Sequence, residues 1–504
     1  MKKLLLIVLC TLFIVSCSNK KTVVISGKVI GGSPLERIEI VEMSGVATLP
    51  IANFGVDAQG NFADTIQIPK NGVYTLSYGG SYGTIYLKGG ENVRLSGNSA
   101  AGFPKVFTVE GDSKNNVFLQ KTQTYLDNYF SKINQDIITQ DETKFIDQLK
   151  KFKSDLNKEM DNLVKSTGAD SDLVKWKKDE LDVNLLMISG QYEMMHGQIT
   201  NKPNFKVSQT YKDFQKELKK NEDEKIKVYP SYRNYILSTI GQDFQAYMAK
   251  DQKADVTTTE KFINFMKTKK DYSQTIKDYL TAFVATSVDM HPQQTSLDKL
   301  TKLLDENIKD SEVKAGLKKV EEAIYGLKIG TAAPSVDFID VNGKKVSSSS
   351  FNGKPTLIMF YASWNSYIAE SVVPMLKEIS NTYKNKVNFV FADMDDNAAQ
   401  FKKTAVAMLN GIEGQKLYAK GGLKSEMAQK YALYGFKLPS FVILDKDAKI
   451  ASKNFMNIMD PDFKTALDKV SGITGPAIAP PQMQVQPAPA PADSTKVKTE
   501  AKAK

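Results

Sequence analysis

A short turn after an apolar strand holds the residue types best suited to chemistry in this chain. Residues 364–368 read Trp-Asn-Ser-Tyr-Ile, and the hydroxyl of Ser366 is a candidate nucleophile. A serine nucleophile needs a general base beside it. The chain has two histidines, His196 and His291, and both fall in a helical stretch upstream of the turn. Serine catalysis is therefore not expected, and a polar side chain without a catalytic role is the simpler interpretation.

Three acids follow the next expected strand, at Asp393, Asp395 and Asp396. A calcium loop of the EF-hand type needs glycine at its sixth position and an acid at its twelfth. Counted from Asp393, those positions hold Ala398 and Thr404. The pattern favours a helix N-terminus, where side-chain oxygens cap free N–H groups and negative charge is stabilising. With two histidines, a zinc or iron site is not expected either, so the sequence predicts no metal or cofactor.

The cysteines, Cys10 and Cys17, both lie near the N-terminus. Two lysines precede the apolar run 4–15, a pattern typical of a secretory signal peptide and short for a membrane span. The run Ile-Val-Ser-Cys that ends at Cys17 resembles the lipobox of bacterial lipoproteins, which implies cleavage after residue 16 and acylation of Cys17. An ordinary signal peptide with an unrelated cysteine is the alternative. Several acyl chains would anchor the protein to a bilayer.

Location and redox chemistry follow from these two cysteines. Residues 18–21 form a short tether without an aspartate directly after Cys17 and without an acidic run, which favours the periplasmic face of the outer membrane. Residues 18–504 contain no cysteine. Because thiol–disulfide exchange requires an attacking thiolate, the expected mature chain cannot perform it.

The length and net charge of the chain indicate how many domains it has and which partners are not expected. A chain of 504 residues is too long for one core, and about three domains are expected. The formal net charge is +10, but lysines alternate with acids, as in residues 216–225, which is typical of a solvated helix face. Nucleic-acid binding would favour clustered basic residues interleaved with aromatic residues. No such cluster is present, so nucleic acid is not an expected partner.

Residues 22–112 have the pattern of a β-sandwich. Short runs of alternating polar and apolar residues recur every 8–12 residues with glycine-rich turns between them. The segments 25–28 (Ile-Ser-Gly-Lys) and 60–62 (Gly-Asn-Phe) resemble the N-terminal β-sandwich domain of unknown function that precedes thioredoxin-like domains in envelope lipoproteins. No residue of this region suggests catalysis.

Residues 113–327 change to a helical period. Apolar residues recur at spacings of three and four from Phe145 to Leu163, which predicts amphipathic helices that pack on one another rather than a ligand site. Breaks are expected at 201–204, at 229–231 and at His291 with the proline that follows.

Residues 328–472 resemble a thioredoxin-like domain of the TlpA, ResA and AhpC/TSA type. The resemblance rests on the entry segment 330–334, the strand 356–360 leading to Ala-Ser-Trp, and the run 435–445 that contains Pro439. In this family Ala-Ser-Trp precedes Cys-x-x-Cys. Here the two cysteine positions hold Asn365 and Ile368, or Ser366 and Ala369 when the count runs backward from Pro374. Residues 473–504, rich in Pro, Ala and Lys, predict a disordered tail.

The resemblance implies that Pro439 forms a cis-proline loop against the turn, and that the backbone before it can pair with an extended peptide. A proline retained only for folding is the alternative. The candidate peptide-binding residues are Asn365, Ser366, Tyr367, Leu438 and Pro439, and the vestigial active-site turn is Trp364, Asn365 and Ile368.

The predicted fold is a multidomain α+β chain with a β-sandwich, an irregular helical region and a thioredoxin-like α/β domain. The first functional hypothesis is a redox-inactive envelope lipoprotein that binds or scaffolds a protein partner whose identity the sequence does not reveal. The second is the thiol–disulfide oxidoreductase activity that the resemblance alone implies. The third is a carrier of a small ligand or glycan in the β-sandwich.

Overall fold

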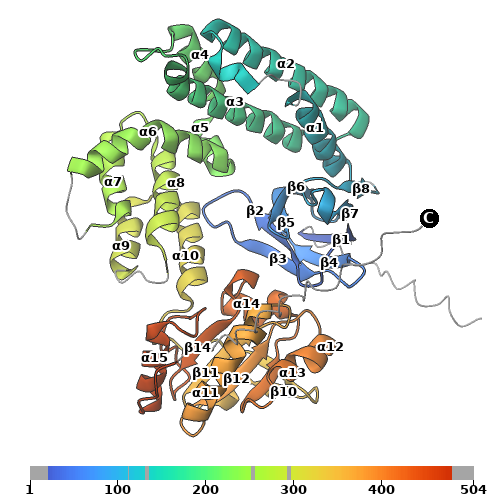
Figure 1. The fold of residues 1–504 in the computed structure, drawn as a ribbon, viewed down its shortest axis with the longest axis vertical. Helices are drawn as coiled ribbons and strands as arrows, with labels where there is room; N and C mark the ends of the chain where they lie inside the picture. The colour runs from blue at the N-terminus through green and yellow to red at the C-terminus, as the bar shows by residue number, and fades with distance from the viewer. Residues whose placement is uncertain (1–20, 112, 131–134, 251–255, 292–296, 479–504) are drawn as a thin grey trace, which may run out of the picture.

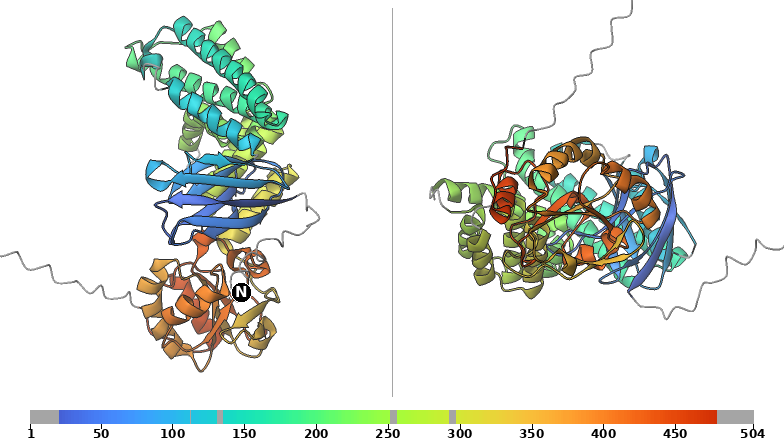
Figure 2. Two further views of the ribbon diagram at one scale, coloured as in Figure 1. Left: turned by 90° about the vertical axis from the view of Figure 1, so that its right-hand side faces the viewer. Right: turned by 90° about the horizontal axis from the view of Figure 1, so that it is seen from below.

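The computed structural model describes residues 21–111, 113–130, 135–250, 256–291 and 297–478 (Figure 1). The expected lipidation site Cys17, the signal peptide and most of the expected tail lie outside these residues. Three regions follow one another along the chain: two packed sheets, a set of helices and a C-terminal α/β domain. Seen from the side, the sheets lie between the helical hairpins at one end and the α/β domain at the other (Figure 2).

The N-terminal region is a sandwich of two four-stranded sheets, with strand orders β4-β1-β7-β8 and β3-β2-β5-β6. Alternate residues such as Val23, Ile25, Ile38 and Ile40 are buried between the sheets, as the period-two pattern predicts. The strands are Thr22–Ile30 (β1), Arg37–Glu42 (β2), Pro50–Gly55 (β3), Asn61–Gln67 (β4), Gly72–Tyr78 (β5), Ser81–Leu87 (β6), Asn92–Asn98 (β7) and Thr108–Glu110 (β8).

The structure explains why the segments 25–28 and 60–62 of the sandwich each contain a glycine. A Cβ atom on Gly27 would lie 1.7 Å from the Leu95 carbonyl oxygen, so the parallel strands β1 and β7 can meet there only at glycine. Gly60 has φ +79°, the left-handed conformation that the turn before β4 requires. The segment 25–28 therefore marks a close contact between the paired strands β1 and β7, and the segment 60–62 marks a tight turn.

The helical region contains ten α-helices among the described residues. Its stripe from Phe145 to Leu163 is buried in one apolar cluster with residues of the other helices, as the period predicts. The helices are Lys114–Phe130 (α1), Glu142–Thr167 (α2), Ser171–Ile199 (α3), Gln209–Leu218 (α4), Glu222–Val228 (α5), Pro230–Lys250 (α6), Thr258–Thr268 (α7), Gln274–Val284 (α8), Leu297–Asn307 (α9) and Ser311–Tyr325 (α10). Within the described part of the chain, no helix has the length and apolarity needed to span a bilayer.

The C-terminal domain is built on a six-stranded mixed sheet with the order β10-β9-β13-β12-β11-β14. Strand β11 is buried at every residue, with one apolar cluster on each face of the sheet. The strands are Asp337–Asp340 (β9), Lys345–Ser347 (β10), Thr356–Tyr361 (β11), Asn388–Asp393 (β12), Gln415–Tyr418 (β13) and Ser440–Leu444 (β14). The helices are Val373–Tyr383 (α11), Ala398–Gln400 (α12), Val406–Met408 (α13), Glu426–Lys430 (α14) and Pro461–Ser471 (α15).

The structure adds two features that the sequence pattern does not reveal. Strand β3 forms from a segment without clear alternation and pairs with β2. Residues 473–478 were expected to belong to the tail, but Ile473 and Ile478 pack against the core of the C-terminal domain. Gly475 N–H also donates to Asp468 Oδ1 over 2.9 Å. The packed part of this domain therefore extends beyond residue 472.

Candidate functional site

The turn after β11 is short and internally bonded. Asn365 N–H donates to the Ala362 carbonyl and Ile368 N–H to the Asn365 carbonyl, over 3.2 and 3.1 Å. A π-helical turn follows at Ile368–Val372, closed by the bond from Val373 N–H to the Ile368 carbonyl. A π-helical turn accommodates one more residue than an α-helical turn. The forward count from Trp364 and the backward count from Pro374 differ by one residue, and the π-helical turn can accommodate that residue after the Trp364 turn. This arrangement fits the forward count, in which Asn365 and Ile368 stand at the two cysteine positions.

The side chain of Asn365 joins this turn to the loop before β14. Its amide nitrogen donates to the Leu438 carbonyl oxygen over 2.8 Å, and the Leu438–Pro439 peptide bond is cis, as the resemblance implies. Leu438 and Pro439 are buried. A peptide that pairs with the Leu438 carbonyl would first have to displace the Asn365 amide.

The remaining predicted residues of the turn divide between surface and core. Ser366 is exposed, Tyr367 is 43% exposed and Ile368 is fully buried. Within the described residues, no hydrogen bond joins Ser366 to either histidine, and His196 is buried in the helical region with its Nδ1 2.8 Å from the Ile138 carbonyl oxygen. The structure thus brings Asn365 to Leu438 and Pro439, and leaves Ser366 and Tyr367 facing outward.

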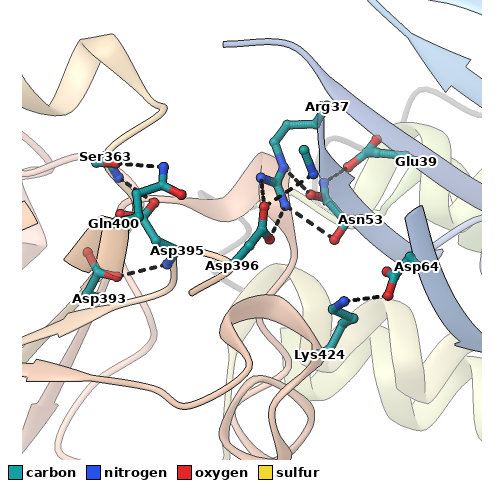
Figure 3. A network of polar contacts seen from close by, with 11 residues as sticks. Arg37, Glu39, Asn53, Asp64, Ser363, Asp393, Asp395, Asp396, Gln400 and Lys424 are labelled. Carbon is teal, nitrogen blue, oxygen red and sulfur yellow. Dashed lines mark hydrogen bonds and ion pairs between the residues drawn. The ribbon is translucent and has the colours of Figure 1, made fainter. Parts of the chain in front are cut away.

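The β-sandwich covers the other side of the turn. The guanidinium of Arg37, on β2, lies 4.7 Å from the centroid of the Trp364 ring. It also donates two parallel hydrogen bonds to Asp396, with Nη1–Oδ2 at 2.7 Å and Nη2–Oδ1 at 2.8 Å (Figure 3). The Arg37 side chain is 9% exposed, so this is a bidentate and largely desolvated pair with a cation–π contact beside it.

Further contacts hold the sandwich in this position. Asn53 Oδ1 accepts from Arg37 Nε over 2.6 Å, and Asn53 Nδ2 donates to Glu39 over 2.6 Å, so that the Arg37 side chain is oriented from its own domain. A second ion pair joins Lys424 to Asp64 at 2.6 Å (Figure 3). The sandwich therefore docks directly against the end of the C-terminal domain that carries the turn.

The acids after β12 have different roles from the one predicted. None of them caps the helix: Asn397 is the N-cap residue of α12, and its side chain accepts from Gln400 N–H. Asp396 turns toward Arg37 instead. Asp393 and Asp395 point inward, where Asp393 Oδ1 accepts from Asp395 N–H and Asp395 Oδ1 accepts from Ser363 N–H, over 2.9 and 3.0 Å. The N-cap prediction is thus wrong for all three acids.

Burial changes the proton affinity of the groups beneath the turn. Asp393 and Asp395 are fully buried, and burial raises the pKa of both carboxyl groups. The neighbouring Asp395 charge raises the pKa of Asp393 further, because two like charges in contact oppose each other's ionisation. On the loop before Pro439, burial lowers the pKa of the Lys437 ammonium to about 8.

Several buried polar atoms cluster here without a hydrogen-bond partner in the described chain: Tyr361 Oη, Trp364 Nε1, Asp393 Oδ2 and Asp395 Oδ2. Tyr361 lies opposite Asp393 in the sheet register. Polar groups of this kind usually bind ordered water. Buried carboxyl and phenol groups therefore lie beneath the Trp364 turn, and burial favours the protonated form of the carboxyl groups.

Sequence reasoning missed Arg37 and the contact with Asp396. The two residues lie 359 positions apart, and neither belongs to a motif. One signal was available: the sequence has three arginines, Arg37, Arg94 and Arg233, among many lysines. Arginine is favoured over lysine for bidentate and stacked contacts at interfaces.

Comparison with known proteins identifies the C-terminal region. A family described as thioredoxin-like matches residues 352–450. Among curated proteins, thiol-disulfide oxidoreductase ResA of Bacillus thuringiensis subsp. konkukian is 28% identical over 130 residues, which cover 25% of this chain and 68% of that protein. ResA of Bacillus anthracis is 28% identical over 130 residues, with 25% and 69% covered.

Two solved structures align with the same part of the chain. The thioredoxin domain of a thiol-disulfide oxidoreductase from Bacteroides vulgatus is 22% identical, covers 29% of this chain and 99% of that one, and gives a TM-score of 0.25. A thiol-disulfide oxidoreductase from Bacteroides fragilis is 24% identical, with 25% and 90% covered and a TM-score of 0.22. The family match and the order of elements along the chain confirm the predicted arrangement of sheets, helices and a C-terminal thioredoxin-like domain.

Proposed function

We propose that this chain, whose C-terminal region is a thioredoxin-like domain, is a redox-inactive lipoprotein of the cell envelope that binds or scaffolds another protein. The observation that supports the redox-inactive part of the proposal is the bond from Asn365 Nδ2 to the Leu438 carbonyl. Counted forward from Trp364, Asn365 stands at the first cysteine position, and its amide joins the turn to the cis-proline loop. The domain keeps the architecture of the site while residues 18–504 lack any thiol.

A partner would meet the open part of the site, which we define as Ser366, Tyr367 and Phe436. Phe436 is 58% exposed and stacks on Tyr434 with ring centroids 5.5 Å apart. Exposed aromatic rings of this kind are enriched where proteins bind one another. Arg37 covers Trp364 while the sandwich is docked, so a peptide would approach the turn from the side of Tyr367.

Anchoring belongs to the same proposal. Acylation of Cys17 would hold the three regions at a membrane surface, which in this proposal is the periplasmic face of the outer membrane. In a Cys17→Ala variant, acyl labelling and membrane association should both be lost. Membrane association that persists in this variant would contradict the anchor.

Oxidoreductase activity is the second candidate, because the matched Bacillus proteins are named thiol-disulfide oxidoreductases. In this chain it would require a thiol from another molecule, since thiol–disulfide exchange proceeds through thiolate attack. The absence of cysteine from residues 18–504 and the amide of Asn365 in the turn argue against exchange chemistry of the chain's own and leave binding as the first candidate.

Photo-crosslinking in intact cells tests the binding role. A photo-reactive residue replaces Tyr367, and the matched control replaces Tyr82, which is 65% exposed on the sandwich. We expect one discrete adduct from position 367 that is absent from position 82. Equal labelling from both positions, or no adduct from position 367, would contradict binding at this turn.

A further inference from the structure

A large cleft lies between the helical region and the C-terminal domain. One wall comes from α9 and α10, on the side of the helical region that faces the C-terminal domain (Figure 1). The other comes from residues 453–462, which lead into α15, and the connection 326–329 lines the cleft between them. Its volume is about 1330 Å³, above the range of about 300–1,000 Å³ that small-molecule pockets have. The size therefore suits a stretch of polypeptide.

Apolar side chains of both regions reach this cleft. Leu297 packs against the cluster of the helical region, and Met459 and Leu327 pack against the two clusters of the C-terminal domain, yet all three remain partly exposed and line the cleft. Ile329, in the connection, is 59% exposed. A ligand that covers these side chains removes apolar surface from water, which favours binding.

Three carboxylates without a partner line the same cleft. They belong to Asp298 on α9 and to Glu321 and Glu322 on α10, and none of them forms a side-chain hydrogen bond or ion pair with another described residue. Glu321 is partly buried, and burial raises its pKa, with further contributions from the charges of Glu322 and Asp298. The three charges therefore oppose one another, and a cation beside them would be stabilised.

The lysines of the cleft leave this negative charge uncompensated. Lys453 is already paired with Asp460 and Asp462, over 3.6 and 3.0 Å. Lys318 and Lys328 weaken the repulsion between the carboxylates of α10, but neither forms an ion pair among the described residues. Six acids and four lysines line the cleft, so it is negative in a chain whose formal net charge is +10. A basic ligand would thus be attracted to this cleft rather than to the chain in general.

We propose that the cleft binds an extended segment of another protein that carries both basic and apolar side chains. A lysine or arginine of the segment lies against Glu321 and Glu322, and its apolar side chains cover Ile329 and Met459. Because the two walls belong to different regions, the bound segment holds the helical region and the C-terminal domain together. The cleft shares no residue with the open part of the site at the Trp364 turn, so this second surface does not depend on the proposed role of that turn.

Fluorescence anisotropy with purified residues 18–504 tests the chemistry of the ligand. The probe is a short labelled peptide of alternating lysine and leucine, for which we expect saturable binding. Two matched peptides, one with glutamate in place of lysine and one with serine in place of leucine, should each bind at least about tenfold more weakly. A peptide that binds equally well without its lysines or without its leucines would overturn the proposal.

A pair of substitutions tests the place of binding. Glu321→Gln combined with Glu322→Gln keeps the side-chain shapes, removes two charges and should weaken binding of the lysine–leucine peptide by about tenfold. Glu306→Gln combined with Glu312→Gln is the matched control, because these exposed acids lie on the same two helices outside the cleft. The control should bind as the wild type does, and equal affinity in the two double variants would overturn the proposal.

A direct measurement does not depend on any variant. A photo-reactive group at the centre of the lysine–leucine peptide should label the wild-type chain within residues 297–329 or 453–462. Labelling spread over the whole chain would overturn the site. Binding that appears only after deletion of the lysine-containing segment 479–504 would identify that segment as the occupant and overturn the assignment to another protein.

Discussion

Asn365 shows how a single side chain can join the two loops of a site that contains no thiol. Its amide donates to Leu438, the residue before Pro439, over 2.8 Å. A hydrogen bond of this kind contributes about 0.5–1.5 kcal/mol to stability. It also occupies a backbone acceptor that would otherwise be free at the edge of the turn. The Asn365 side chain therefore has a structural role, and the turn does not depend on a disulfide for its shape.

Arg37 is the residue that ties the turn to the sandwich. In Arg37→Met the bidentate bond to Asp396 and the stacking on Trp364 are both lost, while Asp396 is left without its partner. Truncating one member of such a pair costs about 2–5 kcal/mol. We expect a clear fall in the free energy of unfolding, measured in urea.

Arg94→Met is the matched control for this substitution. Arg94 pairs with Glu110 at 2.9 Å, but the two side chains are 67% and 49% exposed. Exposed ion pairs contribute about 0–1 kcal/mol. Equal losses in the two variants would show that Arg37 contributes no more than a surface pair.

Asp393 makes stability depend on pH. Its pKa is raised by burial and by Asp395, so the folded state keeps a proton that the unfolded chain releases above about pH 4. The free energy of unfolding must then fall as pH rises from about 4 toward the raised pKa, by at most about 1.4 kcal/mol per pH unit for one proton. Asp393→Asn should remove this fall.

The difference between wild type and Asp393→Asn isolates the effect from other titrating groups. The variant should gain stability relative to the wild type as pH rises from about 5 to 8, in urea unfolding at each pH. A difference that does not change with pH would mean that Asp393 is ionised in the folded state.

At the scale of elements, the two loops at the site are shaped by close contacts. The π-helical turn Ile368–Val372 absorbs an extra residue and keeps Asn365 opposite Leu438. The loop Gly435–Lys437 lies against the sandwich, where a Cβ on Gly435 would be 2.5 Å from Asn53 Nδ2 and 3.3 Å from Glu39 Oε1. Glycine is needed here for close approach between domains.

Gly435→Ala should therefore separate the loop from β2 and β3. Overpacking of this kind costs about 1–3 kcal/mol, and we expect a lower unfolding midpoint with faster proteolysis between the sandwich and the C-terminal domain. Gly241→Ala is the matched control, because its Cβ would meet no atom and it lies within α6. That variant should gain about 0.5–1 kcal/mol. A neutral Gly435→Ala would argue against tight docking.

At the scale of the whole molecule, local patterns in the sequence predicted the three regions well. Alternation predicted the sandwich, the stripe from Phe145 to Leu163 predicted packed helices, and the apolar run before Trp364 predicted strand β11 of the α/β domain. These features depend on neighbours within a few residues, so they are visible in a single sequence. The candidate groove at Ser366 and Tyr367 stays a prediction.

The contacts between regions were not predictable in this way. Arg37 meets Asp396, Lys424 meets Asp64, and Arg233 meets Gly45 across long sequence separations. Each depends on how complete domains pack, and no local period encodes that. Asp396 shows the same limit, because its position suggested a helix cap, whereas its partner is Arg37 of the sandwich.

The central claim is that the thioredoxin-like domain works without redox chemistry. Insulin reduction by purified residues 18–504 in dithiothreitol tests it most directly, with a cysteine-containing thioredoxin-like oxidoreductase as the positive control. Because a thiolate is required for exchange, we expect the same rate as with dithiothreitol alone. Insulin reduction that increases in proportion to the concentration of this protein would contradict the claim.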